Sequence, residues 1–327
     1  MGDSLRIKDI ASAAGVSNAA VSRALKGQPG LSEETRQRIL QIAHQGGYDF
    51  SRLRNEKIRR ILFLLHKQHN ISHSLPFYSP LLLGIEQACS QQNIALSFLA
   101  LGPTDSVTDQ VMRHHPDALL CAGFFEPELI EELQNTQLPI TLVDSWFPNL
   151  PSVNPDNFHG AYLATQHLIH MGRTRIAFLA RSLAHYSIRL REKGYRQALF
   201  DHNILLPPEY EAIAPPIIDT EKSLTEAVED LLKLENPPDS IFAYNDAAAL
   251  IAMRTCQQHG LKIPQDIAVV GFDDIELARM VFPPLTTIEI DKNRLGHEAV
   301  ELAIKMDAGT VNRILPIRLI QRKSAGE

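Results

Sequence analysis

The 327-residue chain is predicted to be an α/β protein with a small helical domain at its N-terminus. Beyond residue 60, short apolar or β-branched runs alternate with longer segments of helical pattern, which is typical of parallel sheets covered on both faces. Before residue 60, three short helical segments follow one another. The length exceeds what one hydrophobic core usually serves, so we expect two or three domains.

Composition and charge narrow the class of protein. With 44% hydrophobic and 21% charged residues, the chain has the composition of a globular protein. It shows no secretory signal and no apolar run long enough to span a membrane, so we expect it to be cytoplasmic. Three cysteines lie far apart in apolar surroundings, which indicates reduced core thiols rather than disulfides or a zinc site: Cys89, Cys121 and Cys256.

Charge is distributed unevenly along the chain. Residues 1–60 contain 11 Lys and Arg against 6 Asp and Glu, whereas residues 61–327 contain 21 against 32. A basic head on an acidic body predicts a polyanionic partner for the head alone, although a solvated charged face would give the same count.

The head has the pattern of a helix-turn-helix unit. Residues 9–14 form a short helix, Gly15 supplies a tight turn, and residues 18–26 form a second helix with Ser17 as its N-cap. A third helix opens at Ser32 and ends at Gly46. In such a unit the second helix lies in the major groove of DNA and its first residues contact base edges.

The first turn of the second helix carries small side chains suited to base contact. The Asn18 amide can pair with adenine, and the methyl groups of Ala19 and Ala20 can lie against a thymine methyl. The alternative is a helical scaffold on whose surface these residues have no role. We predict double-stranded DNA as a partner, contacted by Ser17, Asn18, Ala19, Ser22, Arg23 and Lys26.

The stretch "IKDIASAAGVSNAAVSRAL" and the following "LSEETRQRI" resemble the DNA-binding head of the lactose/galactose repressor (LacI/GalR) family. Carried over by position, Asn18 and Ala19 fall where that family chooses its operator sequence, and Ser17, Ser22 and Arg23 match positions widely used for DNA contact. The resemblance implies a homodimer on a pseudo-palindromic operator.

The linker, residues 50–60, departs from that family. Its members follow the head with Tyr-x-Pro-Asn and a hinge helix whose leucine wedges into the minor groove; here Phe50 and Ser51 replace Pro-Asn and Lys57 stands at the leucine position. We expect weaker DNA bending, with phosphate or minor-groove contacts from the linker and Leu53 as a substitute wedge. The linker candidates are Arg52, Leu53, Arg54 and Lys57.

The body is predicted to hold two parallel sheets. Strands are expected at residues 61–65, 95–101, 118–123, 140–144, 175–180, 240–245 and 267–272, with crossover helices such as 80–92 and 189–202 between them. We therefore divide the chain into a head at 1–49, a linker at 50–60 and a core at 61–327, with an N-lobe at about 61–158, a C-lobe at about 159–288 and closing segments at 289–327.

Stretches of the body, including "HLIHMGRTRIAFLA", "RLREKGYRQAL", "AYNDAAALIAMR" and "DIAVVGFDDIELA", resemble the effector-binding core of the same family. That core has two lobes like those of periplasmic sugar-binding proteins, with a ligand cleft between them. The resemblance implies that Arg191 faces the cleft.

Polar residues at strand ends are the candidate effector contacts, because ligands of open α/β sheets bind beyond the carboxyl ends of strands. For Asn245, Asp246, Asp273 and Asp274 the alternative role is that of a helix N-cap. Arg191 could instead be a solvated side chain, and Trp146 could fill the core or a dimer surface. A sugar also needs an aromatic cover, for which Trp146, Tyr186 and Phe77 compete. The predicted contacts are Phe77, Asp144, Trp146, Arg191, Asn245 and Asp273.

These features predict a transcription regulator, a repressor whose operator affinity is controlled by a small metabolite, most simply a sugar. The sequence shows none of the nucleotide-binding or nucleophile motifs of common enzymes and predicts no catalytic residue, cofactor or metal, although His66, His69 and His73 are clustered. A transport binding protein would need a signal peptide and no basic head. The sequence does not decide which metabolite is the effector, whether it acts as an inducer or a co-repressor, or whether the protein is a dimer or a tetramer.

Overall fold

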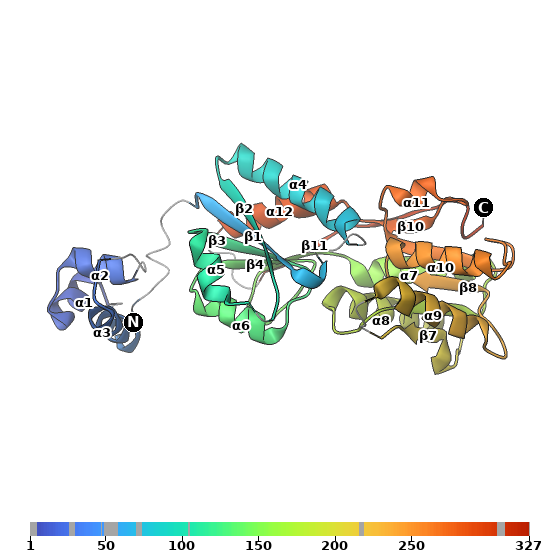
Figure 1. The fold of residues 1–327 in the computed structure, drawn as a ribbon, viewed down its shortest axis with the longest axis horizontal. Helices are drawn as coiled ribbons and strands as arrows, with labels where there is room; N and C mark the ends of the chain where they lie inside the picture. Colours follow the sequence, from blue (N-terminus) through green and yellow to red (C-terminus); the bar gives the residue numbers. More distant parts are fainter. Residues whose placement is uncertain are drawn as a thin grey trace. The chain divides into compact units, whose positions relative to one another are not determined.

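The computed structural model describes residues 5–25, 30–46, 48, 58–69, 74–103, 105–215, 219–305 and 311–326. The chain divides into a head, Met1–Ile58, and a core, Arg59–Glu327, which are described separately (Figure 1). Five of the predicted DNA contacts lie outside the described residues: Lys26, Arg52, Leu53, Arg54 and Lys57.

The head contains the predicted helix-turn-helix unit. Its helices are α1 (Ile7–Ala14), α2 (Asn18–Leu25) and α3 (Glu33–Gln45). Gly15 ends α1 with a φ of 65°, and the hydroxyl of Ser32 accepts a hydrogen bond from the Thr35 amide at the start of α3. The helices pack around one small cluster of buried side chains: Ile10, Ala11, Ala14, Val21, Ala24, Ile39, Ala43 and Tyr48.

The N-lobe of the core is built on a six-stranded parallel sheet in the order β11-β5-β4-β3-β1-β2. Its strands are β1 (Arg60–His66), β2 (Ala95–Leu101), β3 (Ala118–Ala122), β4 (Ile140–Val143), β5 (Ser152–Pro155) and β11 (Asn312–Leu315). Its helices are α4 (Leu75–Gln91), α5 (Val107–Arg113), α6 (Pro127–Asn135) and α12 (Lys292–Ile304), with a short 3-10 turn, η2 (Lys67–His69).

The C-lobe repeats this plan with the order β12-β10-β9-β8-β6-β7. Its strands are β6 (Ile176–Ala180), β7 (Glu211–Ile213), β8 (Ser240–Ala243), β9 (Ala268–Asp273), β10 (Thr286–Glu289) and β12 (Arg318–Ile320). Its helices are α7 (Asn157–His170), α8 (Tyr186–Asp201), α9 (Thr220–Leu232), α10 (Asp246–Gln258) and α11 (Leu277–Met280), with the 3-10 turn η3 (Pro208–Tyr210). Only the pairing of β12 with β10 is antiparallel among the described strands.

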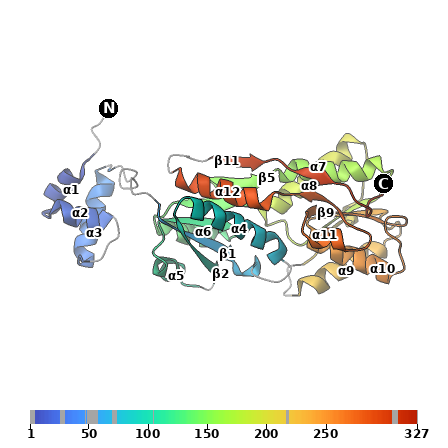
Figure 2. The same ribbon diagram turned by 90° about the horizontal axis from the view of Figure 1, so that it is seen from above.

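The chain passes between the two lobes three times within the described residues. It leaves the N-lobe between β5 and α7, returns between β10 and α12, and crosses again between β11 and β12. α12 packs along α4, as both views show (Figure 1, Figure 2). Residues that follow the C-lobe in sequence therefore complete the N-lobe.

The seven expected strands are all present as β1, β2, β3, β4, β6, β8 and β9, with ends that differ by at most two residues. Five further strands were missed because they are short and carry polar or proline residues; β5, for example, reads Ser-Val-Asn-Pro although all four residues are buried. The expectation that a helix starts at Pro80 is wrong, since α4 begins at Leu75 and holds Pro80 inside it.

Cys89, Cys121 and Cys256 are buried and none is in a disulfide. No helix in the described parts of the chain is long and apolar enough to cross a membrane. The described residues hold no group of three His, Cys, Asp or Glu side chains that could bind a metal, and His73 lies outside them.

Candidate functional site: a DNA-reading helix and a cavity between two lobes

The exposed face of α2 begins with the predicted base contacts. Ser17, Asn18 and Ala19 are exposed, and the Ser17 hydroxyl accepts a hydrogen bond from the Ala20 amide at 3.2 Å, as an N-cap does. Arg23 is exposed too, and its Nε donates to the Ala19 carbonyl at 3.4 Å. Ala20 is buried, with only 9% of its surface exposed, so the expectation that its methyl group contacts a base is wrong.

The core contains a cavity, here called the effector cavity, at the carboxyl ends of strands from both sheets. The N-lobe contributes residues that follow β1 and β4 together with the start of α4, and the C-lobe contributes residues that follow β6, β8 and β9. This is where open α/β sheets bind ligands. Five of the six predicted effector contacts line it: Phe77, Asp144, Arg191, Asn245 and Asp273.

Arg191 is the central cation of the cavity. It lies on α8 with only 3% of its surface exposed. Its Nε donates to the Asn157 side chain at 2.9 Å, Nη1 donates to the Tyr244 carbonyl at 2.5 Å, and Nη2 lies 3.5 Å from an Asp273 oxygen. The guanidinium also lies 3.7 Å from the centre of the Phe272 ring. These contacts fix the orientation of Arg191 before any ligand binds.

Asp144 and Asp273 supply the carboxylates. Each ends a strand in a left-handed backbone conformation, with φ of 52° and 113° respectively. For the Oδ1 atom of each, the described residues provide no hydrogen-bond partner. Among these residues, Oδ1 of Asp144 has no partner, and Oδ1 of Asp273 has only the ion pair with Nη2 of Arg191 at 3.5 Å. Buried polar atoms are almost always hydrogen-bonded, so these two oxygens retain capacity to accept hydrogen bonds from a ligand. Strained backbone at such positions is also typical of binding sites.

Burial shifts the pKa of several groups in the cavity. It raises the pKa of Asp144 to about 7 and that of Asp273 to about 6, and in both cases Arg191 counteracts the rise. It lowers the pKa of His185 to about 4 and the pKa of His69 well below its ordinary value. The two imidazoles are therefore neutral at pH 7, while the carboxyls titrate near it.

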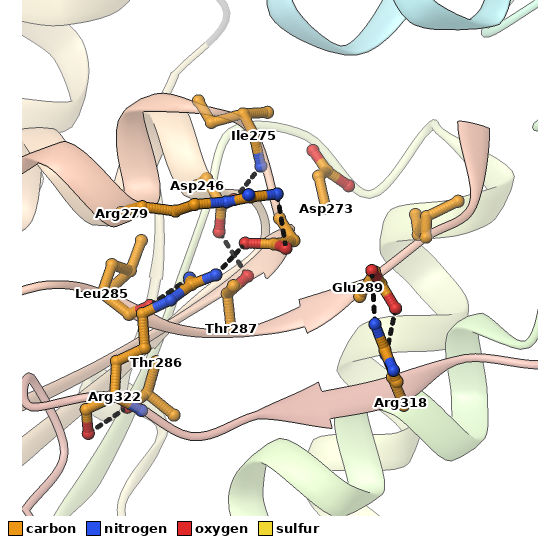
Figure 3. Close-up of polar contacts among 12 residues, drawn as sticks. Asp246, Asp273, Ile275, Arg279, Leu285, Thr286, Thr287, Glu289, Arg318 and Arg322 are labelled. Atoms are coloured by element: carbon orange, nitrogen blue, oxygen red, sulfur yellow. Dashed lines mark hydrogen bonds and ion pairs between the residues drawn. The ribbon is translucent and has the colours of Figure 1, made fainter. Parts of the chain in front are cut away.

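The other strand-end residues form hydrogen bonds or ion pairs with groups of the protein itself. Asn245 caps α10 by accepting the Ala248 amide at 2.9 Å, the alternative considered from sequence, while still lining the cavity. Asp246 is fully buried and accepts hydrogen bonds from the Ile275 amide and the Thr287 hydroxyl (Figure 3). Asp274 pairs with Arg322 at 2.6 Å. Neither Asp246 nor Asp274 lines the cavity.

Trp146 does not line the cavity. Its side chain is 45% exposed and stacks on Tyr186, with ring centroids 6.0 Å apart and planes 22° apart. Because Trp146 follows β4 of the N-lobe and Tyr186 begins α8 of the C-lobe, the pair joins the two lobes outside the cavity. The aromatic side chains that do line it are Phe77, Tyr78 and Tyr244.

Several lining residues were not among the predicted effector contacts. They include Gln68 and His69 after β1, Arg181 and His185 after β6, and Thr220 at the start of α9. Tyr244 and Thr220 had a usable signal. Tyr244 follows β8 and precedes the predicted contact Asn245, and Thr220 begins α9 directly after its N-cap. His185 had none, because its placement depends on loop conformation.

Comparisons with known proteins agree with this arrangement. The family model described as "Bacterial regulatory proteins, lacI family" matches residues 6–50, and "Periplasmic binding protein-like domain" matches residues 165–325. The transcriptional repressor PurR of Aliivibrio salmonicida is 31% identical over 315 residues, which cover 91% of each chain. The ribose operon repressor of Haemophilus influenzae is 32% identical over 312 residues, also 91% of each chain.

Solved structures share the fold over nearly the whole chain. A complex of the transcriptional regulator CelR with cellobiose has a TM-score of 0.75 at 24% identity, covering 98% of this chain and 99% of that one. The lac repressor dimer bound to operator and the anti-inducer ONPF has a TM-score of 0.70 at 23% identity, covering 99% and 100%.

The chain therefore belongs to the lacI family of bacterial regulatory proteins, as the resemblance predicts. It is a DNA-binding transcription regulator controlled by a small-molecule effector.

Proposed function

We propose that the protein is a homodimeric repressor that reads a pseudo-palindromic operator with α2 and is released from it by an uncharged, hydroxyl-rich effector such as a sugar. The observation that carries the effector class is a pair of buried carboxyl oxygens, Oδ1 of Asp144 and of Asp273, that accept no hydrogen bond from the described residues in a cavity that also holds Arg191 and Asn245. Sugar hydroxyls donate to carboxylates and accept from guanidinium and amide groups. The rings of Phe77 and Tyr78 offer apolar surface to a sugar's C–H face.

The charge inside the cavity favours an uncharged ligand. Asp144 and Asp273, whose pKa values are about 7 and 6, line the cavity with two guanidinium groups, Arg181 and Arg191, and the neighbouring histidines are neutral at pH 7. Asp273 is therefore mostly ionised at pH 7 and Asp144 about half ionised. A phosphorylated ligand would add negative charge beside the carboxylates, which raises the cost of keeping them ionised. Relatives whose names or complexes involve ribose and cellobiose support the same class.

A dimer follows from the way two-fold operators are read, since one head binds only one half-site. The relative solved on operator DNA is a dimer. The C-lobe also exposes three large apolar side chains on and after α11, Leu277, Met280 and Phe282, which are 48%, 71% and 86% exposed. We propose that these belong to the dimer surface.

We also propose that the cavity binds its ligand without transforming it. Asp144 and Asp273 are two carboxyl groups of raised pKa, which a glycoside hydrolase also uses. Here Arg191 holds Asp273 as an ion pair, which suits an acceptor rather than a proton donor. Incubating the protein with the bound sugar and finding it chemically unchanged is the direct check.

The test begins with selection of tight-binding sequences from random duplex DNA by the purified protein. We expect a pseudo-palindrome to emerge. The selected operator is then used to screen D-ribose, D-glucose, D-galactose and cellobiose for release, with ribose 5-phosphate as the charged comparison. Release by an uncharged sugar supports the proposal, tightening by one makes the effector a co-repressor, and release by the phosphate alone overturns the effector class.

A further inference from the structure

Lys292 holds an unusual place in the core. It is the first residue of α12, only 8% of its surface is exposed, and it does not line the effector cavity. A cation is disfavoured in the first turn of a helix by the helix dipole, and burying an ammonium group without partners is costly. The position therefore needs a specific reason for a lysine.

The ammonium group is satisfied by three backbone carbonyls. Nζ of Lys292 donates to the carbonyls of Asp273 and Asp274 at the end of β9 and to the carbonyl of Ile290, the last two at 3.3 Å. A lysine has three donors, so this set uses all of them. It lies at the segment where the chain returns from the C-lobe to the N-lobe.

The carbonyls belong to the turn that carries an effector contact. Asp273 and Asp274 have φ of 113° and 50°, a conformation that non-glycine residues adopt only when their surroundings enforce it. The Asp273 side chain faces Arg191 in the cavity, while its carbonyl faces Lys292. Lys292 thus fixes the backbone from which the Asp273 carboxylate projects.

Lys292 is also linked to the N-lobe wall of the cavity, because it begins α12 and α12 packs against α4. α12 and α4 touch backbone to backbone, since a Cβ built on Gly84 would lie 2.3 Å from the Asn293 carbonyl oxygen and one on Gly296 would lie 2.6 Å from that of Leu81. α4 in turn presents Phe77 and Tyr78 to the cavity. Lys292 therefore connects the Asp273 turn to α12, which packs against α4.

We propose that Lys292 is a positioning residue that holds the Asp273 carboxylate for the effector and links that turn to the α12–α4 pair of the N-lobe. The part of this inference that concerns effector binding rests on the proposed function, whereas the part that concerns the turn does not.

The first test needs no ligand. Hydrogen exchange is measured on the full chain for Lys292→Met, with Arg294→Met as the matched control, because Arg294 is on the same helix with a half-exposed side chain. We expect exchange at the Ile275 and Ile290 amides, which bond to Asp246 and Asp273, to rise about tenfold or more in Lys292→Met and to stay unchanged in the control. Rates within about twofold of the wild type would overturn the proposal.

The second test is a double-mutant cycle on binding of the sugar that releases the wild-type protein from its operator, measured by calorimetry. Lys292→Met is expected to weaken binding about tenfold in the wild-type background and to have little further effect on Asp273→Asn, because it acts through Asp273. Losses that multiply would show that Lys292 acts elsewhere and contradict the proposal. If no sugar binds the wild-type protein, the proposed function fails, while hydrogen exchange still decides the role of Lys292 in the turn.

Discussion

Nη2 of Arg191 lies 3.5 Å from Oδ1 of Asp273, and both side chains are nearly fully buried. This ion pair joins α8 to the end of β9, two elements of the C-lobe that meet at the effector cavity. The pair leaves acceptor capacity on Asp273, whose Oδ1 has no hydrogen bond from the described residues. The cavity is therefore held in shape by groups that themselves line it.

Removing the cation should destabilise the core. In Arg191→Met the Asp273 carboxylate loses its buried partner, so we expect the free energy of unfolding to fall by about 3–5 kcal/mol. Arg196→Met, on the exposed face of the same helix, should cost about 0–1 kcal/mol because its pairs with Glu192 and Glu211 are solvated. Urea unfolding of both variants measures the difference, and equal losses would contradict the account.

The raised pKa of Asp144 predicts a pH dependence of stability. In the folded protein this pKa is about 7, against an ordinary value of 3.8, so the folded chain binds the proton more tightly than the unfolded chain does. The contribution of Asp144 to the free energy of unfolding should fall as pH rises from about 4 to about 7 and stay constant above that.

Asp144→Asn removes this contribution and is the control. Compared with the variant, the wild-type protein should lose stability more steeply over that range in urea unfolding at several pH values. Histidines of lowered pKa act in the opposite direction at low pH in both proteins, so they cancel in the comparison. Parallel curves for the two proteins would show that Asp144 titrates normally.

Trp146 offers a natural probe of movement between the lobes. It is the single tryptophan of the chain and stacks on Tyr186 of the other lobe. A ligand that changes the separation of the lobes should change its fluorescence emission, and Tyr186→Leu should remove that change. Because Trp146 does not line the cavity, Trp146→Phe should alter effector affinity by less than about threefold, whereas Phe77→Ala should weaken it about tenfold or more. A larger loss in Trp146→Phe than in Phe77→Ala would restore Trp146 as the aromatic cover.

Two variants of α2 should separate base contact from phosphate contact. Asn18→Ala should cost about 1–3 kcal/mol of operator affinity and relax the preference at one base pair of each half-site. Arg23→Gln should weaken binding to all sequences and reduce the slope of affinity against salt by about one unit. Competition binding with selected and randomised duplexes measures both, and a sequence-specific effect of Arg23→Gln would place it at a base instead.

The linker differs from the family pattern at Lys57, which stands where the family has the leucine that wedges into DNA. Lysine cannot intercalate as an apolar side chain does, so DNA bending should be weaker than a wedge produces. Gel phasing with the selected operator measures the bend. A sharp central kink would contradict this expectation, and its loss in Leu53→Ala would assign the wedge to Leu53.

The sequence predicts the fold because its strong signals are local. Buried strands such as β3 and β9 are continuous apolar runs, and Gly15 marks the turn of the head. Strand β5 escapes prediction because Asn154 and Pro155 resemble a loop, and their burial depends on pairing with β11, about 160 residues later. Which residues complete a lobe is decided by such distant pairing.

The site was predictable where residue type and strand end coincide, as at Asp144, Asn245 and Asp273. It was not predictable at His185, whose ring centroid lies 5.2 Å from that of His69 although the two residues come from different lobes. Trp146 was predicted to line the cavity because it is close to Asp144 in the sequence. After the left-handed residue Asp144, however, the indole stacks on Tyr186 of the other lobe instead.

The most direct test of the account measures the affinity of the wild-type protein and of Asp273→Asn for the selected operator while the releasing sugar is titrated. We predict that both proteins bind the operator equally without sugar, and that the variant needs about tenfold or more sugar for release, since it lacks one buried carboxylate acceptor. Equal sugar dependence of the two proteins would contradict the claim that occupancy of this cavity controls DNA binding.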